Sequence, residues 1–307
     1  MRCGLSISWC APRQGRHPGY NGGMIQDFDD AYTNGAYIPG GADWPARWTA
    51  SAERFREHLP SRCTAEYGIP YGSGERNRYD LYLPEGGPKG LAVFIHGGYW
   101  MKFQRSDWSH LAQGALGRGW AVAMPGYTLA PENSVSGMTS EIARAITAVA
   151  ARIDGPIRIA GHSAGGHLAT RMICEPSQVP EEVVTRVEQV ISISGLHDLR
   201  PLMRTAMNGT LKLTELEARN ESPALRRPRP GSRVMCWVGD SERPEFIRQN
   251  DLLANIWHGL GIDIAAHHEA GRHHFDVIED LTDPASALAR LFAPLSLIHI
   301  SEPTRPY

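Results

Sequence analysis

Short apolar runs of strand length alternate with helical patterns along most of this 307-residue chain. Such alternation is typical of βαβ units, whose parallel strands form a sheet that is buried on both faces. The strand-like runs are residues 77–83, 91–95, 120–124, 157–160, 190–193, 234–238 and 262–266, and the helix-like stretches are residues 140–153, 163–174, 180–187, 244–259 and 276–282. We therefore predict an α/β fold with a mostly parallel central sheet and helices on both faces, with a ligand site beyond the carboxyl ends of the strands.

Charge and motif content exclude several classes of function. A net charge of −2 provides no basic field for nucleic acid or for an anionic membrane surface. The five cysteines are scattered and odd in number, which favours a reducing compartment over a disulfide framework or a zinc site. Phosphate-binding glycine motifs and a membrane-spanning apolar run are missing from the sequence. We expect a cytoplasmic protein with a small-molecule substrate and without metal or cofactor, and we leave a homodimer open.

The two ends differ in character from the rest of the chain. Residues 1–23 lack a clean secretion signal and are interpreted as a doubtful extension, with Met24 as the natural start. Residues 24–60 are predicted to form an N-terminal arm packed on a main domain at 61–294. Residues 295–307 begin with LSLIHISEPTR, which matches the translation of a transposase-type sequencing adapter, and we interpret them as an artefact.

A glycine-rich stretch reads GHSAGG at residues 161–166 and fits the pattern Gly-x-Ser-x-Gly. With 32 glycines in the chain, the bare pattern arises by chance in roughly a fifth of such sequences. The context makes it informative, because a buried strand precedes it and a helical pattern follows it. Small residues let the backbone turn sharply and lift a hydroxyl above the sheet. The stretch therefore predicts a nucleophilic Ser163.

A serine nucleophile requires a base, and the base requires an orienting acid. In this class of fold they follow in the order serine, acid, histidine. Asp240 and Glu242 follow the strand at 234–238, and His273 and His274 follow the last strand. From order alone, either carboxylate and either histidine could serve.

Acyl transfer also requires N–H donors for the developing oxyanion. One is the N–H of Ala164, directly after the nucleophile. Gly97 and Gly98 follow an early strand and allow close approach of the backbone, so the N–H groups of Gly98 and Tyr99 are predicted to face the substrate. Together these residues form a predicted oxyanion hole.

Five stretches together resemble the kynurenine formamidase (arylformamidase) branch of the α/β-hydrolase superfamily. They are HGGYW at 96–100, GHSAGGHL at 161–168, SGLHDLRPL at 194–202, PEFIRQ at 244–249 and HHFDVIEDL at 273–281. The resemblance implies a metal-free Ser-acid-His hydrolase of N-formyl or ester bonds. In that family the acid lies two residues before the proline of PEF and the histidine directly precedes phenylalanine. The resemblance thus favours Glu242 and His274, with Asp240 and His273 as alternates.

The substrate is the least constrained part of the prediction. We expect Tyr99, Trp100 and His162 to line the substrate pocket, because they adjoin the predicted nucleophile and oxyanion hole. The resemblance favours an arylformamide such as N-formyl-kynurenine, which would yield formate and the free amine. The alternatives are a carboxylesterase for small acyl esters and a non-catalytic binding protein of the same fold, because pocket shape sets the substrate and the sequence reports it poorly.

Overall fold

The computed structural model describes residue 25 and residues 27–295. An eight-stranded sheet with the order β1-β2-β4-β3-β5-β7-β9-β10 forms its centre. The pairs β1–β2 and β2–β4 are antiparallel, and all other neighbours in this sheet are parallel. The strands are β1 (Thr64–Pro70), β2 (Arg78–Leu83), β3 (Leu91–Ile95), β4 (Ala121–Pro125), β5 (Ile157–His162), β7 (Val187–Ile193), β9 (Arg233–Gly239) and β10 (Asp263–Glu269), and β6 (Cys174–Glu175) pairs with β8 (Arg227–Pro228) in a separate ribbon.

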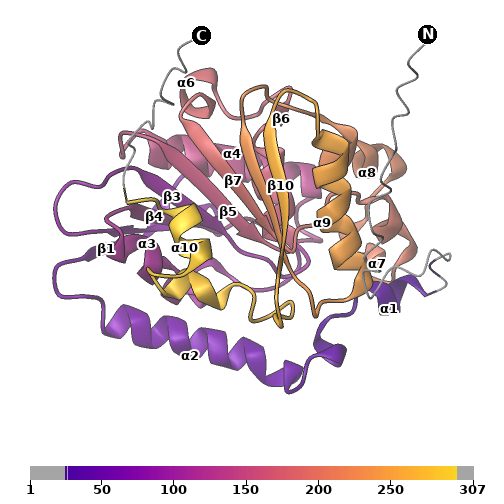
Figure 1. Cartoon of the computed structure of the whole chain (residues 1–307), viewed down its shortest axis with the longest axis horizontal. Helices are drawn as coiled ribbons and strands as arrows, with labels where there is room; N and C mark the ends of the chain where they lie inside the picture. Colours follow the sequence, from indigo (N-terminus) through magenta and orange to yellow (C-terminus); the bar gives the residue numbers. More distant parts are fainter. Residues whose placement is uncertain (1–24, 26, 296–307) are drawn as a thin grey trace, which may run out of the picture.

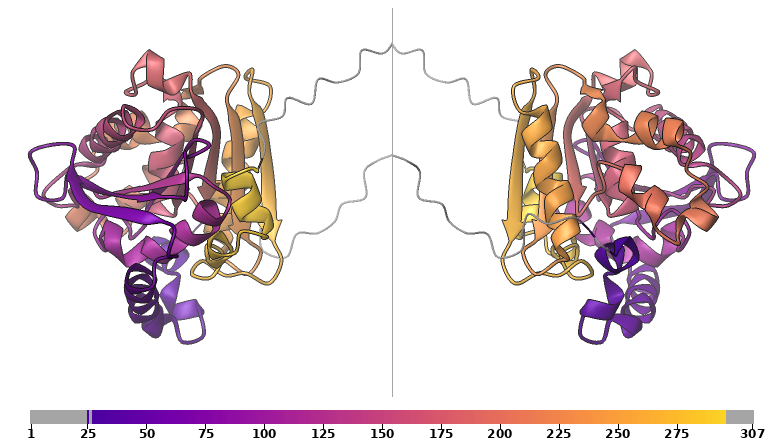
Figure 2. Two further views of the ribbon diagram at one scale, coloured as in Figure 1. Left: turned by 90° about the vertical axis from the view of Figure 1, so that its left-hand side faces the viewer. Right: turned by 90° about the vertical axis from the view of Figure 1, so that its right-hand side faces the viewer.

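The middle of the sheet is apolar on both faces. Every residue of β3, β4 and β5 is buried, as continuous apolar strands require when helices cover both sides. One core cluster joins the sheet to α4 (Val135–Ala150), α5 (Ala164–Arg171) and α9 (Pro244–Trp257). The other joins it to α2 (Trp44–Glu57), α3 (Gln113–Gly117) and α10 (Ala287–Phe292) (Figures 1 and 2). The predicted mostly parallel α/β fold is confirmed.

The N-terminal arm consists of α1 (Phe28–Tyr32), two 3-10 turns and α2. Figure 1 shows α2 crossing the lower end of the molecule, outside the sheet. The turns are η1 (Gly35–Tyr37) and η2 (Gly41–Asp43). Shorter elements occupy the connections: η3 (Arg105–Ala112), α6 (Glu181–Val184), η4 (Arg200–Arg204), α7 (Asn208–Leu211), α8 (Glu215–Glu221), η5 (Pro223–Leu225) and η6 (Glu279–Thr282). The predicted extension at 1–23, and all of the predicted adapter segment except Leu295, lie outside the described residues.

The strands predicted from apolar runs all occur, with bounds that differ by a few residues. Sequence reasoning missed β1, which is half exposed and irregular in register between Glu66 and Ile69, where Gly68 adopts a φ of 66°. An exposed strand of this kind carries little apolar signal. Across the part of the chain that the structure describes, no helix is both long and apolar enough to traverse a lipid bilayer.

Candidate active site

Ser163 lies at the sharp turn between β5 and α5. Its backbone has φ 55° and ψ −118°, a strained conformation for a residue other than glycine. The turn is possible because the residues two positions before and after Ser163 are glycines without side chains. A Cβ atom on Gly161 would lie 2.0 Å from the carbonyl oxygen of Gly165, and one on Gly165 would lie 2.0 Å from that of Ile95. The sequence pattern thus folds as a strand–turn–helix with Ser163 at its apex.

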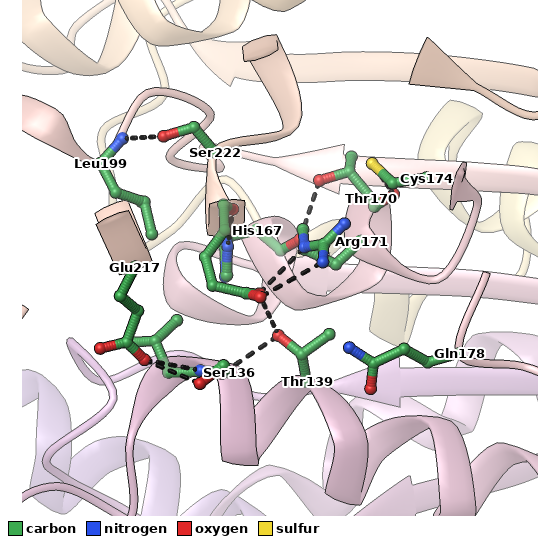
Figure 3. Close-up of polar contacts among 12 residues, drawn as sticks. Ser136, Thr139, His167, Thr170, Arg171, Cys174, Gln178, Leu199, Glu217 and Ser222 are labelled. Atoms are coloured by element: carbon green, nitrogen blue, oxygen red, sulfur yellow. Dashed lines mark hydrogen bonds and ion pairs between the residues drawn. The ribbon is translucent and has the colours of Figure 1, made fainter. Parts of the chain in front are cut away.

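The helix that follows Ser163 is fixed by a buried polar network. The Glu221 carboxylate accepts hydrogen bonds from Arg171 Nε (2.9 Å) and Thr139 Oγ1 (2.7 Å), which ties α8 to α5 and α4. His167 Nε2 donates to the backbone oxygen of Glu221 at 2.7 Å. Figure 3 shows Thr139, His167 and Arg171 converging from these helices. His167 therefore supports α5 and does not serve as a site residue.

His274 and Glu242 form a buried pair. His274 Nδ1 lies 2.7 Å from Glu242 Oε2, and both side chains are at most 3 % exposed. A carboxylate only accepts hydrogen bonds, so Nδ1 carries the proton and Nε2 is left as a base. The other carboxylate oxygen, Oε1, accepts from the Ser194 hydroxyl and from the N–H of Gly239 at 2.9 Å. Sequence reasoning missed Ser194, because a serine after a strand carries no distinctive signal.

The alternate acid Asp240 and the alternate histidine His273 have other hydrogen-bond partners. Asp240 is exposed, and its Oδ1 accepts from the N–H of Gly271 at 2.8 Å, which closes the loop after β10. His273 Nδ1 accepts from the backbone N–H of Phe275 and of Asp276, and the ring packs edge-on against Trp44 at 5.2 Å between centroids. Neither alternate contacts the His274–Glu242 pair.

The glycine turn after β3 lies beside Ser163. A Cβ atom on Gly97 would lie 3.0 Å from the Cβ atom of Ser163, so this backbone approaches the serine as closely as only glycine allows. In the described part of the chain, the backbone N–H groups of Gly98, Tyr99 and Ala164 donate to no protein acceptor. Unpaired N–H groups beside a serine are suited to binding an oxyanion.

A cavity of about 390 Å³ opens at Ser163 and His274. Its size falls within the range of small-molecule sites. Much of the aromatic part of its wall comes from the arm, the η3 region and the loop after β10, and includes Trp48, Phe103, Trp108 and Phe275. The predicted pocket residues Tyr99 and His162 also line it. The arm therefore forms part of the site, which the sequence did not reveal.

The position of Trp100 differs from the sequence prediction that it lines the substrate pocket. It does not line this cavity: its side chain is fully buried and packs edge-on against His167, with 5.3 Å between ring centroids. The left-handed backbone of Trp100, with φ 59°, turns the indole away from Ser163 and into the core. Trp100 thus anchors the turn from inside and is excluded from the substrate pocket.

Burial controls the charge of the histidines around the site. Desolvation lowers the pKa of His96 to about 4 and lowers the pKa of His162 well below its usual value. His162 Nε2 donates to the backbone oxygen of His274 at 2.8 Å, and the two rings lie 4.7 Å apart. The neutral His162 ring therefore supports the backbone of His274. Among the described residues, no cluster of His, Cys, Asp or Glu side chains could hold a metal ion.

Comparison with known proteins assigns the chain to a family. The profile of the α/β-hydrolase fold matches residues 92–225. The chain is 29 % identical to kynurenine formamidase of Danio rerio over 233 residues, which cover 73 % of this chain and 79 % of that protein. It is 31 % identical to an isoprenylcysteine alpha-carbonyl methylesterase of Arabidopsis thaliana over 151 residues, which cover 44 % of this chain and 35 % of that protein.

A solved structure extends the likeness to nearly the full length. It is a protein from Silicibacter sp. TM1040, provisionally described as a thioesterase, with 52 % identity and a TM-score of 0.81. The match covers 87 % of this chain and 98 % of that one. The chain therefore belongs to the α/β-hydrolase family and is a hydrolase similar to the kynurenine formamidases.

Proposed function

We propose that this hydrolase cleaves arylformamides such as N-formyl-kynurenine, with Ser163 as nucleophile, His274 as base and Glu242 as orienting acid. The observation that carries the proposal is the buried hydrogen bond between His274 Nδ1 and Glu242 Oε2, at a cavity that Ser163 and His274 both line. A fixed imidazole beside a serine is the arrangement that acyl transfer requires.

The first half of the reaction forms a formyl-enzyme. Ser163 Oγ attacks the formyl carbon while His274 Nε2 takes the hydroxyl proton, and Glu242 stabilises the imidazolium. The carbonyl oxygen becomes an oxyanion that the N–H groups of Gly98, Tyr99 and Ala164 bind. Each such donor contributes about 3 kcal/mol to transition-state stabilisation. The C–N bond then breaks, and His274 returns the proton to the departing amine.

The second half of the reaction releases formate. His274 takes a proton from water, which attacks the formyl ester, and the Ser163–carbonyl bond breaks with return of that proton to Ser163. The same oxyanion donors act on both tetrahedral intermediates. The chain's own groups are therefore sufficient for each proton transfer in this scheme.

Two observations support an aromatic leaving group. The cavity presents several aromatic side chains, among them Trp48, Phe103, Trp108 and Phe275, which suit a planar ring. The relatives named kynurenine formamidase align over about three quarters of the chain.

The test compares turnover of N-formyl-kynurenine with turnover of p-nitrophenyl acetate, and measures labelling by a fluorophosphonate probe. We expect labelling that the Ser163→Ala variant abolishes, and kcat/KM for the formamide at least equal to that for the ester. Labelling together with a far lower kcat/KM for the formamide would contradict the arylformamide proposal. Folded protein without labelling or hydrolysis would identify a non-catalytic binding protein.

A carboxylesterase is the second candidate. A plant methylesterase matches 44 % of this chain, and a glycine turn with a nucleophilic serine serves ester and amide cleavage alike. The same comparison of turnover distinguishes the two candidates, because one substrate is a formamide and the other is an ester.

A further inference from the structure

Three consecutive residues of the glycine turn adopt positive φ angles. The values are 112° at Gly98, 54° at Tyr99 and 59° at Trp100. This region is open to glycine but unfavourable for L residues with a side chain. Strain of this kind persists only where surrounding contacts enforce it. The contacts around Tyr99 and Trp100 therefore decide where the N–H groups of the turn point.

The two ends of the turn are fixed by the hydrolase domain itself. The Gly98 carbonyl oxygen accepts from the N–H groups of Met101 and Lys102, both at 3.0 Å. Trp100 is buried in the core, and its carbonyl oxygen accepts from the N–H of Ala130 at 2.9 Å. Tyr99 therefore lies between two residues, Gly98 and Trp100, that are held by the hydrolase domain.

Tyr99 is fixed by the N-terminal arm. Its hydroxyl donates to the carbonyl oxygen of Tyr32 at 2.8 Å and accepts from Asn34 Nδ2 at 3.3 Å. Burial raises the pKa of the Tyr99 phenol, so the hydroxyl stays protonated and remains a donor. Tyr32 and Asn34 are more than sixty residues from Tyr99 in sequence, yet both form hydrogen bonds with its hydroxyl.

The arm is itself fixed at this point. The hydroxyl of Tyr32 donates to Glu245 Oε1 at 2.8 Å and accepts from Gln249 Nε2 at 3.3 Å. Arg248 pairs with the same carboxylate at 2.7 Å. Tyr32 is 1 % exposed, so its carbonyl is held by a buried network that begins on α9. A fixed acceptor can in turn fix the Tyr99 side chain.

We propose that Tyr99 is a positioning residue, whose hydroxyl uses residues Tyr32 and Asn34 of the arm to hold the oxyanion-binding backbone in place. The inference rests on the proposed role of Ser163 as nucleophile. In this proposal the arm orients the oxyanion hole through Tyr99, in addition to lining the cavity. Donors act on a transition state only when they are aimed in advance, so loosening Tyr99 weakens the oxyanion site without removing a donor.

The test is the Tyr99→Phe variant, which removes one oxygen atom and keeps the ring and the N–H group. We expect kcat to fall about tenfold on both N-formyl-kynurenine and p-nitrophenyl acetate, a fraction of the loss from deleting an oxyanion donor. KM should stay within about twofold, because ground-state binding does not use the oxyanion. The matched control is Tyr71→Phe, which removes a hydroxyl donated to the Gly126 carbonyl at 2.6 Å outside the cavity.

An oxyanion analogue separates positioning from a general loss of structure. Phenylboronic acid forms a bond from boron to Ser163 Oγ and places a negative oxygen in the oxyanion site. We expect its affinity to fall in parallel with kcat in Tyr99→Phe, while affinity for the product kynurenine stays unchanged. A double-mutant cycle with Asn34→Ala should show that this substitution lowers kcat only while the Tyr99 hydroxyl is present.

The outcomes are distinct. Wild-type kcat in Tyr99→Phe, or a fall in kcat with unchanged boronate affinity, would overturn the positioning role. Additive effects of Asn34→Ala and Tyr99→Phe on kcat would show that the arm does not act through this hydroxyl. A wild-type protein that neither hydrolyses the two substrates nor binds phenylboronic acid would instead overturn the proposed function.

Discussion

At the scale of single residues, two carboxylates separated by one position have opposite environments. β9 ends at Gly239, and the chain then turns so that Asp240 faces solvent while Glu242 points inward. The inward orientation is stabilised by the N–H of Gly239 and by the Ser194 hydroxyl, both of which donate to Glu242. The strand end therefore determines which carboxylate reaches His274.

This division predicts unequal effects of matched substitutions. Glu242→Gln keeps the shape of the side chain but removes the charge that stabilises the His274 imidazolium, so we expect kcat to fall by about 10²- to 10⁴-fold. Asp240→Asn should keep kcat within about twofold, because the Asp240 carboxylate is exposed and accepts hydrogen bonds from Gly271 and Ser241, not from His274. Steady-state kinetics on p-nitrophenyl acetate measures both. The reverse ranking would contradict the proposed acid.

Residue order and residue type limited the candidate site residues to a few, but they did not show which side chains point into the site. Sequence order left Asp240 and Glu242 open, because both follow the same strand and differ only in how the turn directs them. Trp100 adjoins the glycine turn in sequence, yet the positive φ of the turn directs its ring into the core. Side-chain direction after a strand end depends on φ and ψ, which local sequence specifies poorly at strained positions.

At the scale of elements, the turn between β5 and α5 is packed directly against the end of β3. A Cβ atom on Gly165 would lie 2.0 Å from the carbonyl oxygen of Ile95 and 2.7 Å from that of His96. Both obstacles are backbone atoms of a fully buried strand or its end, which cannot move aside. The glycines of the motif thus serve the packing of α5 on the sheet.

We therefore expect Gly165→Ala to reduce the free energy of unfolding by at least about 3 kcal/mol, through overpacking of a buried contact. The control is Gly209→Ala on α7, where a Cβ atom would meet no atom within 4 Å. That change should be neutral or stabilising by up to about 1 kcal/mol. Urea unfolding measures both, and a Gly165→Ala variant as stable as the control would contradict the packing argument.

Helix α2 contributes part of the wall of the cavity at Ser163. Trp48 lines the cavity and packs on Trp108 and Phe275, with ring centroids 4.7 and 5.1 Å away. Trp44 lies one turn earlier on the same helix and does not line this cavity. The two tryptophans form a matched pair for testing an aromatic substrate.

Trp48→Leu should lower kcat/KM for N-formyl-kynurenine about two- to tenfold more than for ethyl acetate, an ester without an aromatic ring, since an aromatic contact contributes about 0.5–1.5 kcal/mol. Trp44→Leu should change the two values by the same factor. Kinetics on the two substrates tests this prediction. An equal effect of Trp48→Leu on both substrates would argue against an aryl group at this wall.

The regular elements were predictable where they are buried, and the arm's role was not. Strands such as β3 and β4 are continuous apolar runs, so hydropathy marks them clearly. The arm lines the cavity with residues that are irregularly spaced in the sequence, such as Tyr32, Asn34 and Trp48. Their spacing depends on how the chain passes over the cavity. No periodic pattern reports such a path, because tertiary contacts alone define it.

At the scale of the whole molecule, buried neutral histidines make contacts between segments that lie far apart in the sequence. His96 stacks on Tyr127, and His167 donates to the Glu221 carbonyl. His197 Nδ1 donates to the Gln249 carbonyl at 2.8 Å. Desolvation, the largest cause in each case, lowers the pKa of His96 and His197 to about 4 and that of His167 to about 3. All three sites favour the uncharged ring.

These shifts predict acid-sensitive stability. Below the ordinary histidine pKa of 6.5, the unfolded chain binds protons that the folded chain excludes until about pH 4, so the stability that is present above pH 6.5 is lost as the pH falls. Between pH 7 and pH 5, each of these histidines lowers the free energy of unfolding by about 2 kcal/mol, and the three together lower it by about 6 kcal/mol. That is a large part of the 5–15 kcal/mol typical of folded proteins. Urea unfolding at the two pH values measures the difference.

His167→Gln isolates one of these contributions. Glutamine places an N–H donor where His167 Nε2 meets the Glu221 carbonyl, but it does not titrate. The difference in unfolding free energy between pH 7 and pH 5 should therefore shrink by about 2 kcal/mol, even if the variant is less stable at both values. The same substitution at the exposed His258 should leave the difference unchanged. Because the prediction concerns a difference across pH within one variant, any loss of packing cancels, and an unaltered difference in His167→Gln would show that this histidine is not held neutral by burial.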